Sequence, residues 1–180
     1  DMLRQAIRKA VIGHKAVPCF CGVALYNRGV EPLLDAIVDY LPSPLDLPGM
    51  NGTDKLTGAE RICAPDPTAP LAALVFKIST DPYVGRLAFF RVYSGVVRRG
   101  ETVYNATSDE RERIGRLVRM YADRREDVSE IGPGDIGAVL GLKSTSTGDT
   151  LCDLSHAIVL EKITFPAPVM SMSIEPLTKS

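Results

Sequence analysis

Residues 71–93 read LAALVFKISTDPYVGRLAFFRVY, two apolar runs separated by the turn residues Asp81 and Pro82. Short runs rich in Val, Ile, Phe and Tyr and bounded by turn residues are typical of β-strands. This stretch therefore predicts two strands, at residues 71–80 and 86–93, and indicates that the centre of the fold is β-rich.

The same pattern of short apolar runs continues after this pair. Glycine-containing turns separate the runs, at Ser94-Gly95, Arg99-Gly100, Gly132-Pro133-Gly134 and Thr147-Gly148-Asp149. Several short strands at regular spacing with such turns are typical of a small closed barrel. The sequence therefore predicts a mainly β fold with a barrel of six to seven strands. Its remaining strands are expected at 102–105, 114–121, 136–142 and 158–163.

The first 41 residues have a different pattern, which predicts a flanking α/β fragment at the N-terminus. Apolar residues recur at helical spacing over residues 3–11 and again over 33–41, after Pro32 in a first helical turn. Residues 16–24 between them are nearly all apolar, which is typical of a strand buried on both faces in a parallel sheet. One such strand cannot form a sheet alone, so we expect the rest of this α/β domain upstream, in a longer chain.

Two segments are predicted to be connections. Residues 43–70 are rich in proline and glycine, and a loop of this length inside one domain would be unusual. We therefore expect an extended linker there, with disorder around residues 49–66. Pro166 and Pro168 predict a second connection, after which a strand at 169–174 would start another domain.

Composition excludes several classes of protein. The net charge of −1, from 21 basic and 22 acidic side chains, argues against nucleic-acid binding by bulk charge and leaves only local patches. No run of about 18 apolar residues is present, so no membrane span is expected. The N-terminal residues lack a charged and then apolar leader, so a signal peptide is not expected.

The candidate metal-binding and catalytic residues form no recognisable motif. The four cysteines, Cys19, Cys21, Cys63 and Cys152, lack the paired spacing of a zinc site. They are expected to be small buried residues of a cytosolic protein, and no metal site is predicted. No Ser/His/Asp or Cys/His arrangement emerges either, so the β region is interpreted as a non-catalytic binding module.

Several stretches of the β region carry a resemblance to a known family. They are KISTDPYVGRL (77–87), FFRVYSG (89–95), GVVRRGETV (95–103), ERIGRL (112–117), GDI (134–136), GLK (141–143) and TGDTL (147–151). In order and spacing these stretches resemble the second domain of translational GTPases, in the elongation factor G branch. Residues 17–36 are similar to the end of the family's GTP-binding domain, and residues 169–179 resemble the opening of its third domain.

The resemblance implies a division of the chain and a function. Residues 1–42 would be the C-terminal remnant of the GTP-binding α/β domain, 43–70 a linker, 71–163 the translation-factor β-barrel domain 2, and 164–180 the start of domain 3. The intact protein would be a cytoplasmic GTPase that uses GTP/GDP with Mg²⁺ and couples hydrolysis to tRNA–mRNA movement. The barrel would contact small-subunit ribosomal RNA and protein, as well as other domains of the same chain, but no DNA and no membrane.

The resemblance also implies a nucleotide-binding loop. In the family the last guanine-recognition loop is usually Ser-Ala followed by a variable residue, and a backbone N–H there contacts the guanine oxygen. The matching residues are Gly22, Val23, Ala24 and Leu25, with Ala24 as the expected donor and Val23 in place of the usual Ser. The sequence contains no Gly-x-x-x-x-Gly-Lys-Ser/Thr and no Asn-Lys-x-Asp, so this piece alone is expected to be inactive.

Basic residues of the β region are the candidates for RNA contact. Clustered guanidinium groups suit a phosphate backbone. The alternative is that acidic neighbours, among them Glu112 and Asp127, neutralise these residues on a solvated surface. The RNA-contact candidates are Arg111, Arg113, Arg116, Arg119 and Lys143.

Two alternative functions stay open at this point. One is a paralogous translational GTPase, such as a ribosome-protection protein, a class-II release factor or a ribosome-recycling paralogue. The other is a stand-alone OB-like RNA-binding module, against which the truncated α/β unit argues.

Overall fold

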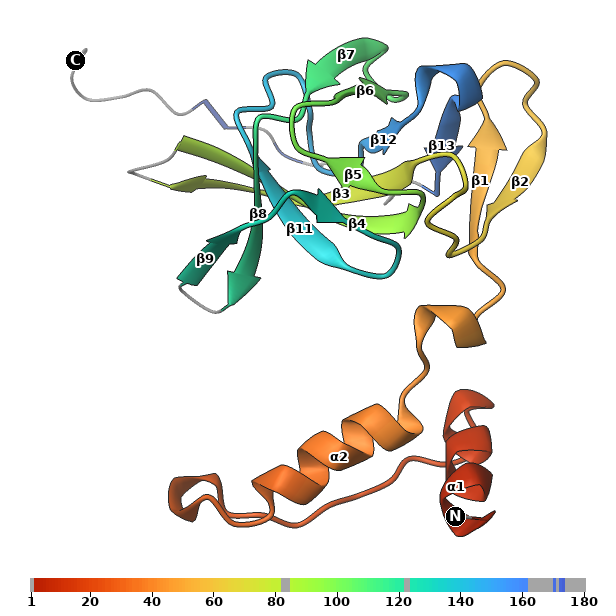
Figure 1. Cartoon of the computed structure of the whole chain (residues 1–180), viewed down its shortest axis with the longest axis vertical. Helices are drawn as coiled ribbons and strands as arrows, with labels where there is room; N and C mark the ends of the chain where they lie inside the picture. The colour runs from red at the N-terminus through yellow and green to blue at the C-terminus, as the bar shows by residue number, and fades with distance from the viewer. Residues whose placement is uncertain (1, 82–84, 122–123, 162–169, 171, 174–180) are drawn as a thin grey trace.

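The protein has a helical N-terminal unit and a β-rich body, joined by a short connection (Figure 1). The structure is a computed structural model, and it describes residues 2–81, 85–121, 124–161, 170 and 172–173. The strand expected at 169–174 therefore lies largely outside the described residues. None of the helices in the described ranges is both long and apolar enough to cross a membrane.

The N-terminal unit contains two α-helices, as the apolar spacing predicted. They are α1 (Met2–Ile12) and α2 (Val30–Tyr40), with the 3₁₀-helix η1 (Ala24–Tyr26) between them. A salt bridge of 3.2 Å between Arg4 Nη1 and Asp39 Oδ2 joins the two α-helices. Ala36 is the buried residue of α2, whereas most of its large apolar side chains are exposed.

The strand predicted at residues 16–24 is not formed. Residues 16–22 belong to no strand, and most of them are exposed. A strand is defined by hydrogen bonds to a neighbouring strand, and these residues pair with none in the described part of the chain. An apolar sequence by itself is therefore not sufficient to make this segment a strand.

The predicted linker contains regular structure. The 3₁₀-helix η2 (Pro44–Asp46) is followed by a hairpin of β1 (Met50–Asp54) and β2 (Glu60–Cys63). Strand β1 also pairs with β13 (Ile158–Leu160), so the hairpin becomes part of the β-rich body. The expectation of disorder around residues 49–66 is thus wrong, because a partner strand about a hundred residues away supplies hydrogen bonds that local sequence cannot reveal.

The main sheet has eight strands in the order β7-β6-β12-β3-β4-β11-β8-β9, and every recorded pairing is antiparallel. Two smaller sheets accompany it, the three-stranded sheet β13-β1-β2 and a two-stranded sheet that pairs β10 with β5. The strands are β3 (Ala72–Asp81), β4 (Gly85–Ser94), β5 (Val97–Arg98), β6 (Thr102–Asn105), β7 (Glu110–Arg113), β8 (Arg116–Tyr121), β9 (Arg124–Asp127), β10 (Glu130–Ile131), β11 (Ile136–Leu140) and β12 (Thr150–Cys152). A 3₁₀-helix, η3 (Leu154–His156), connects β12 to β13.

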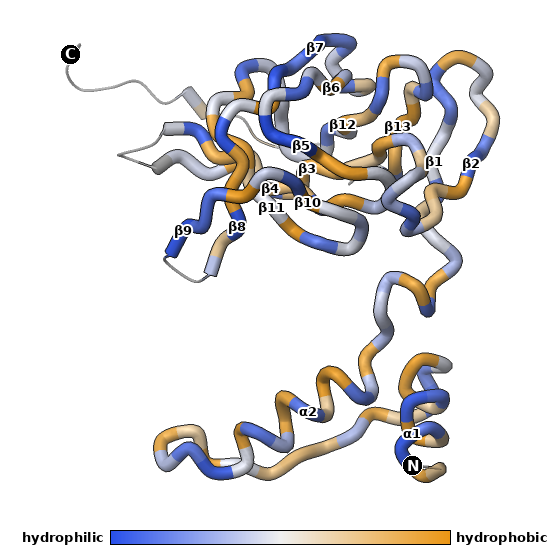
Figure 2. The backbone as a smooth tube through the Cα atoms, viewed as in Figure 1, coloured by the Kyte–Doolittle hydropathy of each residue, from blue (hydrophilic) through white to orange (hydrophobic). Residues whose placement is uncertain are grey.

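The mainly β fold is confirmed, although the strands outnumber the predicted six to seven. The sheets surround a core in which Phe90, Ile114, Leu117 and Leu151 are fully buried. Figure 2 shows apolar segments along β3, β4 and β11, which enclose this core, and polar segments at β7 and β9. The strands that the sequence missed are mostly short or charged, so their apolar pattern is weak.

Candidate functional site

The loop expected to recognise guanine is shaped by its own backbone. Val23 donates its N–H to Arg28 O at 2.9 Å, and Arg28 returns a hydrogen bond to Val23 O at 3.2 Å. Between these residues, η1 is closed by the Asn27 N–H, which donates to Ala24 O at 3.0 Å. The turn is therefore closed by backbone hydrogen bonds without the usual Ser hydroxyl.

The same loop presents a free backbone donor. Ala24 is the first residue of η1, and the first N–H groups of a helix have no acceptor within that helix. Gly22, Val23, Ala24 and Leu25 are all exposed. A backbone N–H at the start of an exposed helical turn can donate to a carbonyl oxygen such as that of guanine.

Two of the predicted RNA-contact arginines are paired with carboxylates. Arg116 makes a bidentate contact with Asp127, with Nε and Nη2 at 2.7 and 2.9 Å from its two carboxylate oxygens. The hydrogen bond from Arg116 lowers the pKa of Asp127. Arg119 Nη2 lies 2.7 Å from Asp135 Oδ2, and the charge of Asp135 raises the pKa of Arg119.

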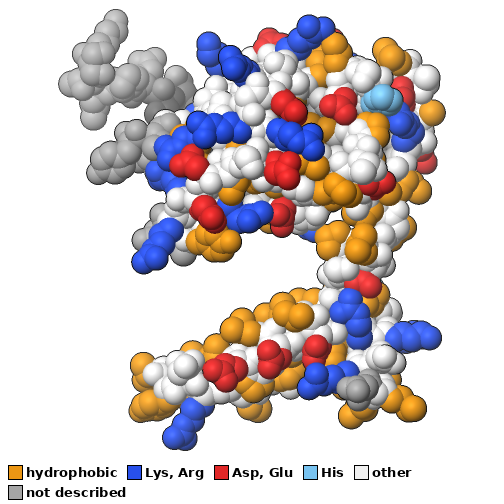
Figure 3. Space-filling model, in the orientation of Figure 1, with side chains coloured by type: hydrophobic (Ala, Val, Ile, Leu, Met, Phe, Trp, Pro, Cys, Tyr) orange, Lys and Arg blue, Asp and Glu red, His pale blue; other side chains and the backbone are white. Residues whose placement is uncertain are grey.

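The other three candidates are differently placed. Arg111 and Arg113 alternate with Glu112 on β7, so their side chains lie on the opposite face from this carboxylate. Both are exposed, and no carboxylate of the described residues lies within salt-bridge distance of either. Lys143 is exposed in the loop after β11. Figure 3 shows basic and acidic side chains intermixed over the visible face of the β-rich body, so that face is not uniformly positive.

Glu112 is a buried structural residue, which corrects its expected role as a surface neutraliser. Its side chain reaches the loop between β11 and β12. Glu112 Oε2 accepts from Lys143 N at 3.0 Å, and Oε1 accepts from Ser144 N at 2.7 Å and from Thr145 Oγ1 at 2.9 Å. With 7% of its surface exposed, the carboxylate replaces water as the acceptor for two backbone donors.

Further polar side chains hold the same loop from other directions. Arg86 donates to Lys143 O at 2.8 Å and to Thr145 O at 2.5 Å. Buried Asn105 donates to Asp149 Oδ2 at 2.8 Å, and that oxygen also accepts from Ser146 N at 2.8 Å. We call the set Arg86, Asn105, Glu112, Thr145 and Asp149 the loop network.

The loop network explains part of the family-like sequence. The stretches at residues 112–117, 141–143 and 147–151 supply its members or the backbone that they hold. Sequence reasoning missed this network because it joins residues that are far apart along the chain. The one local signal is the alternation of Arg111, Glu112 and Arg113, which in a strand places the carboxylate on the opposite face from both arginines.

Two of the four free cysteines are buried and two are exposed. Cys63 and Cys152 are buried, as predicted, and burial raises the pKa of each thiol. Cys19 and Cys21 are exposed, which corrects the expectation that all four would be buried. Their segment was predicted to be a buried strand, and it has no covering sheet in the structure.

Comparison with known proteins first shows which class of domain the β-rich body resembles. Residues 70–154 match the family model described as Elongation factor G domain 2. A crystal structure of a protein from Thermus thermophilus has the same fold, with a TM-score of 0.65 at 24% identity, and the match covers 91% of this chain and 22% of that chain. The β-rich body therefore resembles the second domain of elongation factor G over residues 70–154.

Comparison of whole sequences then shows which proteins the chain is similar to. The chain is 53% identical over all 180 residues to Elongation factor G of Thermotoga maritima, and 54% identical to that of Thermotoga neapolitana. The chain thus resembles elongation factor G over its whole length, and the predicted resemblance is confirmed. It spans 26% of the length of each of these relatives. Neither a paralogous GTPase nor a stand-alone OB-like module is favoured by these matches.

Proposed function

We propose that this chain is part of a ribosomal translocation factor that couples GTP hydrolysis to tRNA–mRNA movement in the cytoplasm. The observation that carries the proposal is the identity of 53% across the entire chain, which includes both the guanine-type loop and the barrel. The barrel contains no catalytic arrangement that the sequence could identify. Its part is to contact the ribosome and to transmit changes between domains.

The helical unit, residues 1–42, is proposed to be the end of the GTP-binding domain. Its apolar groove supports this, since α1, α2 and residues 14–20 surround an open space of about 690 Å³ with mainly apolar walls. Leu33 and Ile37 from α2 line the groove, together with Phe20. Such a surface is normally covered, and the missing part of the same domain would cover it.

Ala24 is proposed to donate its backbone N–H to the guanine oxygen of GTP or GDP in the intact protein. Gly22, Val23 and Leu25 shape the loop around it. Mg²⁺ and the phosphates would be held by residues outside this chain, because a phosphate-binding Gly-x-x-x-x-Gly-Lys-Ser/Thr is absent from its sequence. Hydrolysis therefore belongs to the intact protein.

The 180-residue chain alone is expected to show no GTP binding in isothermal titration calorimetry. One guanine contact supplies too little energy to offset the loss of translational and rotational freedom on binding. The intact protein is expected to bind GTP and to hydrolyse it faster when ribosomes are added. Micromolar affinity of the short chain for GTP would contradict the proposal that the phosphate-binding residues lie outside it. An intact protein whose GTP hydrolysis does not respond to ribosomes would contradict the proposed function.

Ribosomal RNA contact is proposed for Arg111, Arg113 and Lys143. These side chains are exposed, and the two arginines have no carboxylate partner in the described part of the chain. Arg116 and Arg119 are proposed to contribute less, since Asp127 and Asp135 already neutralise them. A guanidinium that is already paired gains less from a phosphate because it must first lose its carboxylate partner.

Replacing Arg111 and Arg113 together by alanine is expected to weaken binding of the chain to small ribosomal subunits. The slope of log affinity against log salt should decrease by about 1 for each phosphate group that the variant no longer touches. Filter binding over a series of salt concentrations measures both quantities.

The matched control removes the same charge from paired positions. Arg116→Ala combined with Arg119→Ala also lowers the net charge by two, but it is expected to leave the salt slope nearly unchanged. Equal effects of the two double variants would indicate that bulk charge, rather than specific contact by Arg111 and Arg113, determines binding.

A further inference from the structure

The connection between the helical unit and the barrel contains a short helix that contacts both. On the helical side, the guanidinium of Arg8 from α1 reaches the end of α2. Arg8 Nη1 donates to Asp39 O at 3.0 Å and to Leu41 O at 3.1 Å. Arg8 Nη2 donates to Asp46 Oδ2, in η2, at 2.5 Å. One side chain therefore ties α1, the end of α2 and η2 together.

The carboxylate of Asp46 has a second partner within the connection. Asp46 Oδ2 accepts the backbone N–H of Ser43 at 2.6 Å, as part of a reciprocal capping box. The Ser43 backbone and then its side chain, with a smaller contribution from Arg8, lower the pKa of Asp46. The Asp46 carboxylate therefore caps η2 and accepts a hydrogen bond from Arg8 of α1 at the same time.

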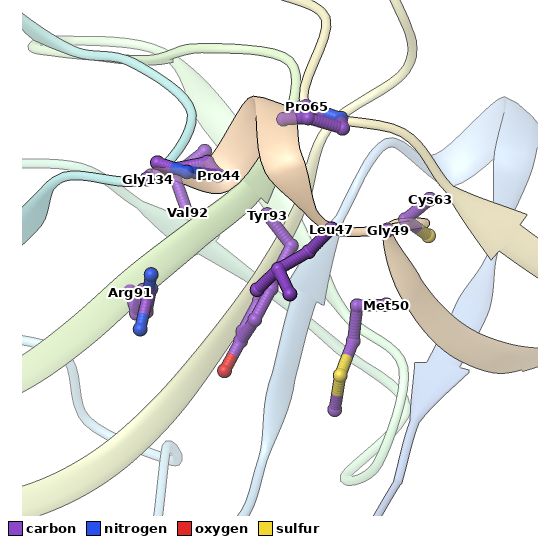
Figure 4. Close-up of a pocket in the computed structure, with 10 residues that line it drawn as sticks. All are labelled: Pro44, Leu47, Gly49, Met50, Cys63, Pro65, Arg91, Val92, Tyr93 and Gly134. Carbon is purple, nitrogen blue, oxygen red and sulfur yellow. The ribbon is translucent and has the colours of Figure 1, made fainter. Parts of the chain in front are cut away.

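On the barrel side, η2 lies against the turn that precedes β11. A Cβ added to Gly134 would lie 2.3 Å from Pro44 Cγ, so Pro44 occupies the space that a side chain at position 134 would need. Next to this contact is a cavity of about 150 Å³, with Leu47 from the connection and Val92 and Tyr93 from β4 in its wall (Figure 4). The surface on which η2 contacts the barrel is therefore mainly apolar. The contact is possible because the residue at position 134 is a glycine, which has no side chain.

These contacts form a continuous path between the two units. The loop at residues 22–25 leads through α2 into η2, and η2 rests on Gly134, two residues before β11 begins. We propose that η2 is the joint that fixes the orientation of the helical unit on the barrel, with Arg8 and Gly134 as its positioning residues. The claim that η2 fixes the orientation of the two units does not depend on the proposed function. The further claim that a change caused by nucleotide binding is transmitted through η2 rests on the proposed function.

The joint is tested by the distance between two spin labels, measured by pulsed electron paramagnetic resonance. Labels are placed on cysteines at Val38 of α2, which is 78% exposed, and at the exposed Ser108 of the β6–β7 turn. The exposed Cys19 and Cys21 are first replaced by serine. The otherwise unchanged chain is expected to give one narrow distance distribution, and a broad distribution would overturn the proposal.

Gly134→Ala is expected to shift and broaden this distribution because the new methyl group displaces Pro44. Gly141→Ala is the matched control, since Gly141 has φ +86° against +87° for Gly134 but nothing within 4 Å of an added Cβ. Both variants introduce the same backbone strain, so Gly141→Ala reports the loss of Tm from strain alone, and only Gly134→Ala should alter the distance. An unchanged distance in Gly134→Ala, or an equal change in Gly141→Ala, would overturn the assignment of Gly134.

Two further variants test the rest of the joint. Adding Pro44→Ala to Gly134→Ala removes the ring that the methyl group meets, so the distribution should return toward that of the unchanged chain. Arg8→Met keeps the apolar length of the side chain but cannot donate to Asp39 O, Leu41 O or Asp46, so it should broaden the distribution. A narrow, unshifted distribution in Arg8→Met would remove Arg8 from the joint. No nucleotide or ribosome is present in these measurements, so their outcome is independent of whether the proposed function is correct.

Discussion

Replacing Phe90 by alanine is expected to lower the free energy of unfolding of the barrel by about 3–5 kcal/mol. Phe90 lies on β4 with 0% of its surface exposed, in the core shared with Val75, Val92 and Leu117. The loss combines the transfer of a large apolar side chain with the cavity left behind. Because single domains are stable by only about 5–15 kcal/mol, this loss removes a large share of the free energy of unfolding.

Urea denaturation followed by circular dichroism measures this effect, since the chain has no tryptophan to serve as a fluorescent probe. Phe76→Ala on the neighbouring strand β3 is the control. Phe76 is 37% exposed, so it should lose clearly less stability. Equal losses in the two variants would show that Phe90 is not at the centre of the core.

Replacing Glu112 by alanine is expected to have the second largest effect, a loss of about 2–4 kcal/mol. Two partly buried backbone donors, Lys143 N and Ser144 N, would lose their acceptor, and a fully buried donor left unsatisfied costs about 1–3 kcal/mol. Glu112→Gln keeps one carbonyl oxygen and the shape of the side chain, so its loss should be smaller. The same denaturation measurement applies to both variants.

Glu110→Ala is the matched control for Glu112, because it removes the same charge from the same strand at an exposed position. Its effect should stay within about 0.5 kcal/mol. Amide hydrogen exchange adds a local measurement: exchange at Lys143 and Ser144 should accelerate in Glu112→Ala and not in Glu110→Ala. Unchanged exchange at both amides would contradict the role of Glu112 in holding the loop.

Local sequence was sufficient to predict some features of the candidate site but not others. The loop at residues 22–25 is a prediction from the family resemblance, and its shape depends on hydrogen bonds between residues close in sequence, such as Val23 and Arg28. The pairing of Arg116 with Asp127 could not be read in the same way. It depends on the antiparallel register of β8 and β9, in which Val118 lies opposite Asp127. The five basic candidates therefore divide into paired and unpaired residues only in the folded chain.

Local sequence was sufficient for the mainly β class and for the longer strands of the β-rich body. The predicted strands at 71–80, 86–93 and 102–105 correspond closely to β3, β4 and β6. In these segments the apolar pattern is continuous, and burial in the core follows from it. The helices α1 and α2 were likewise predicted from their periodicity.

Tertiary structure decided the features that depend on distant partners. Residues 50–63 form a hairpin that β13 extends by pairing with β1, whereas residues 16–22, although more apolar, pair with no strand among the described residues. Glu112 is buried because the loop at 143–145 offers it three donors. The sequence by itself determined the class of fold and the resemblance to a known family. Pairing across long sequence separations decided which polar residues are structural and which remain exposed, because hydrogen bonds and burial depend on neighbours in space.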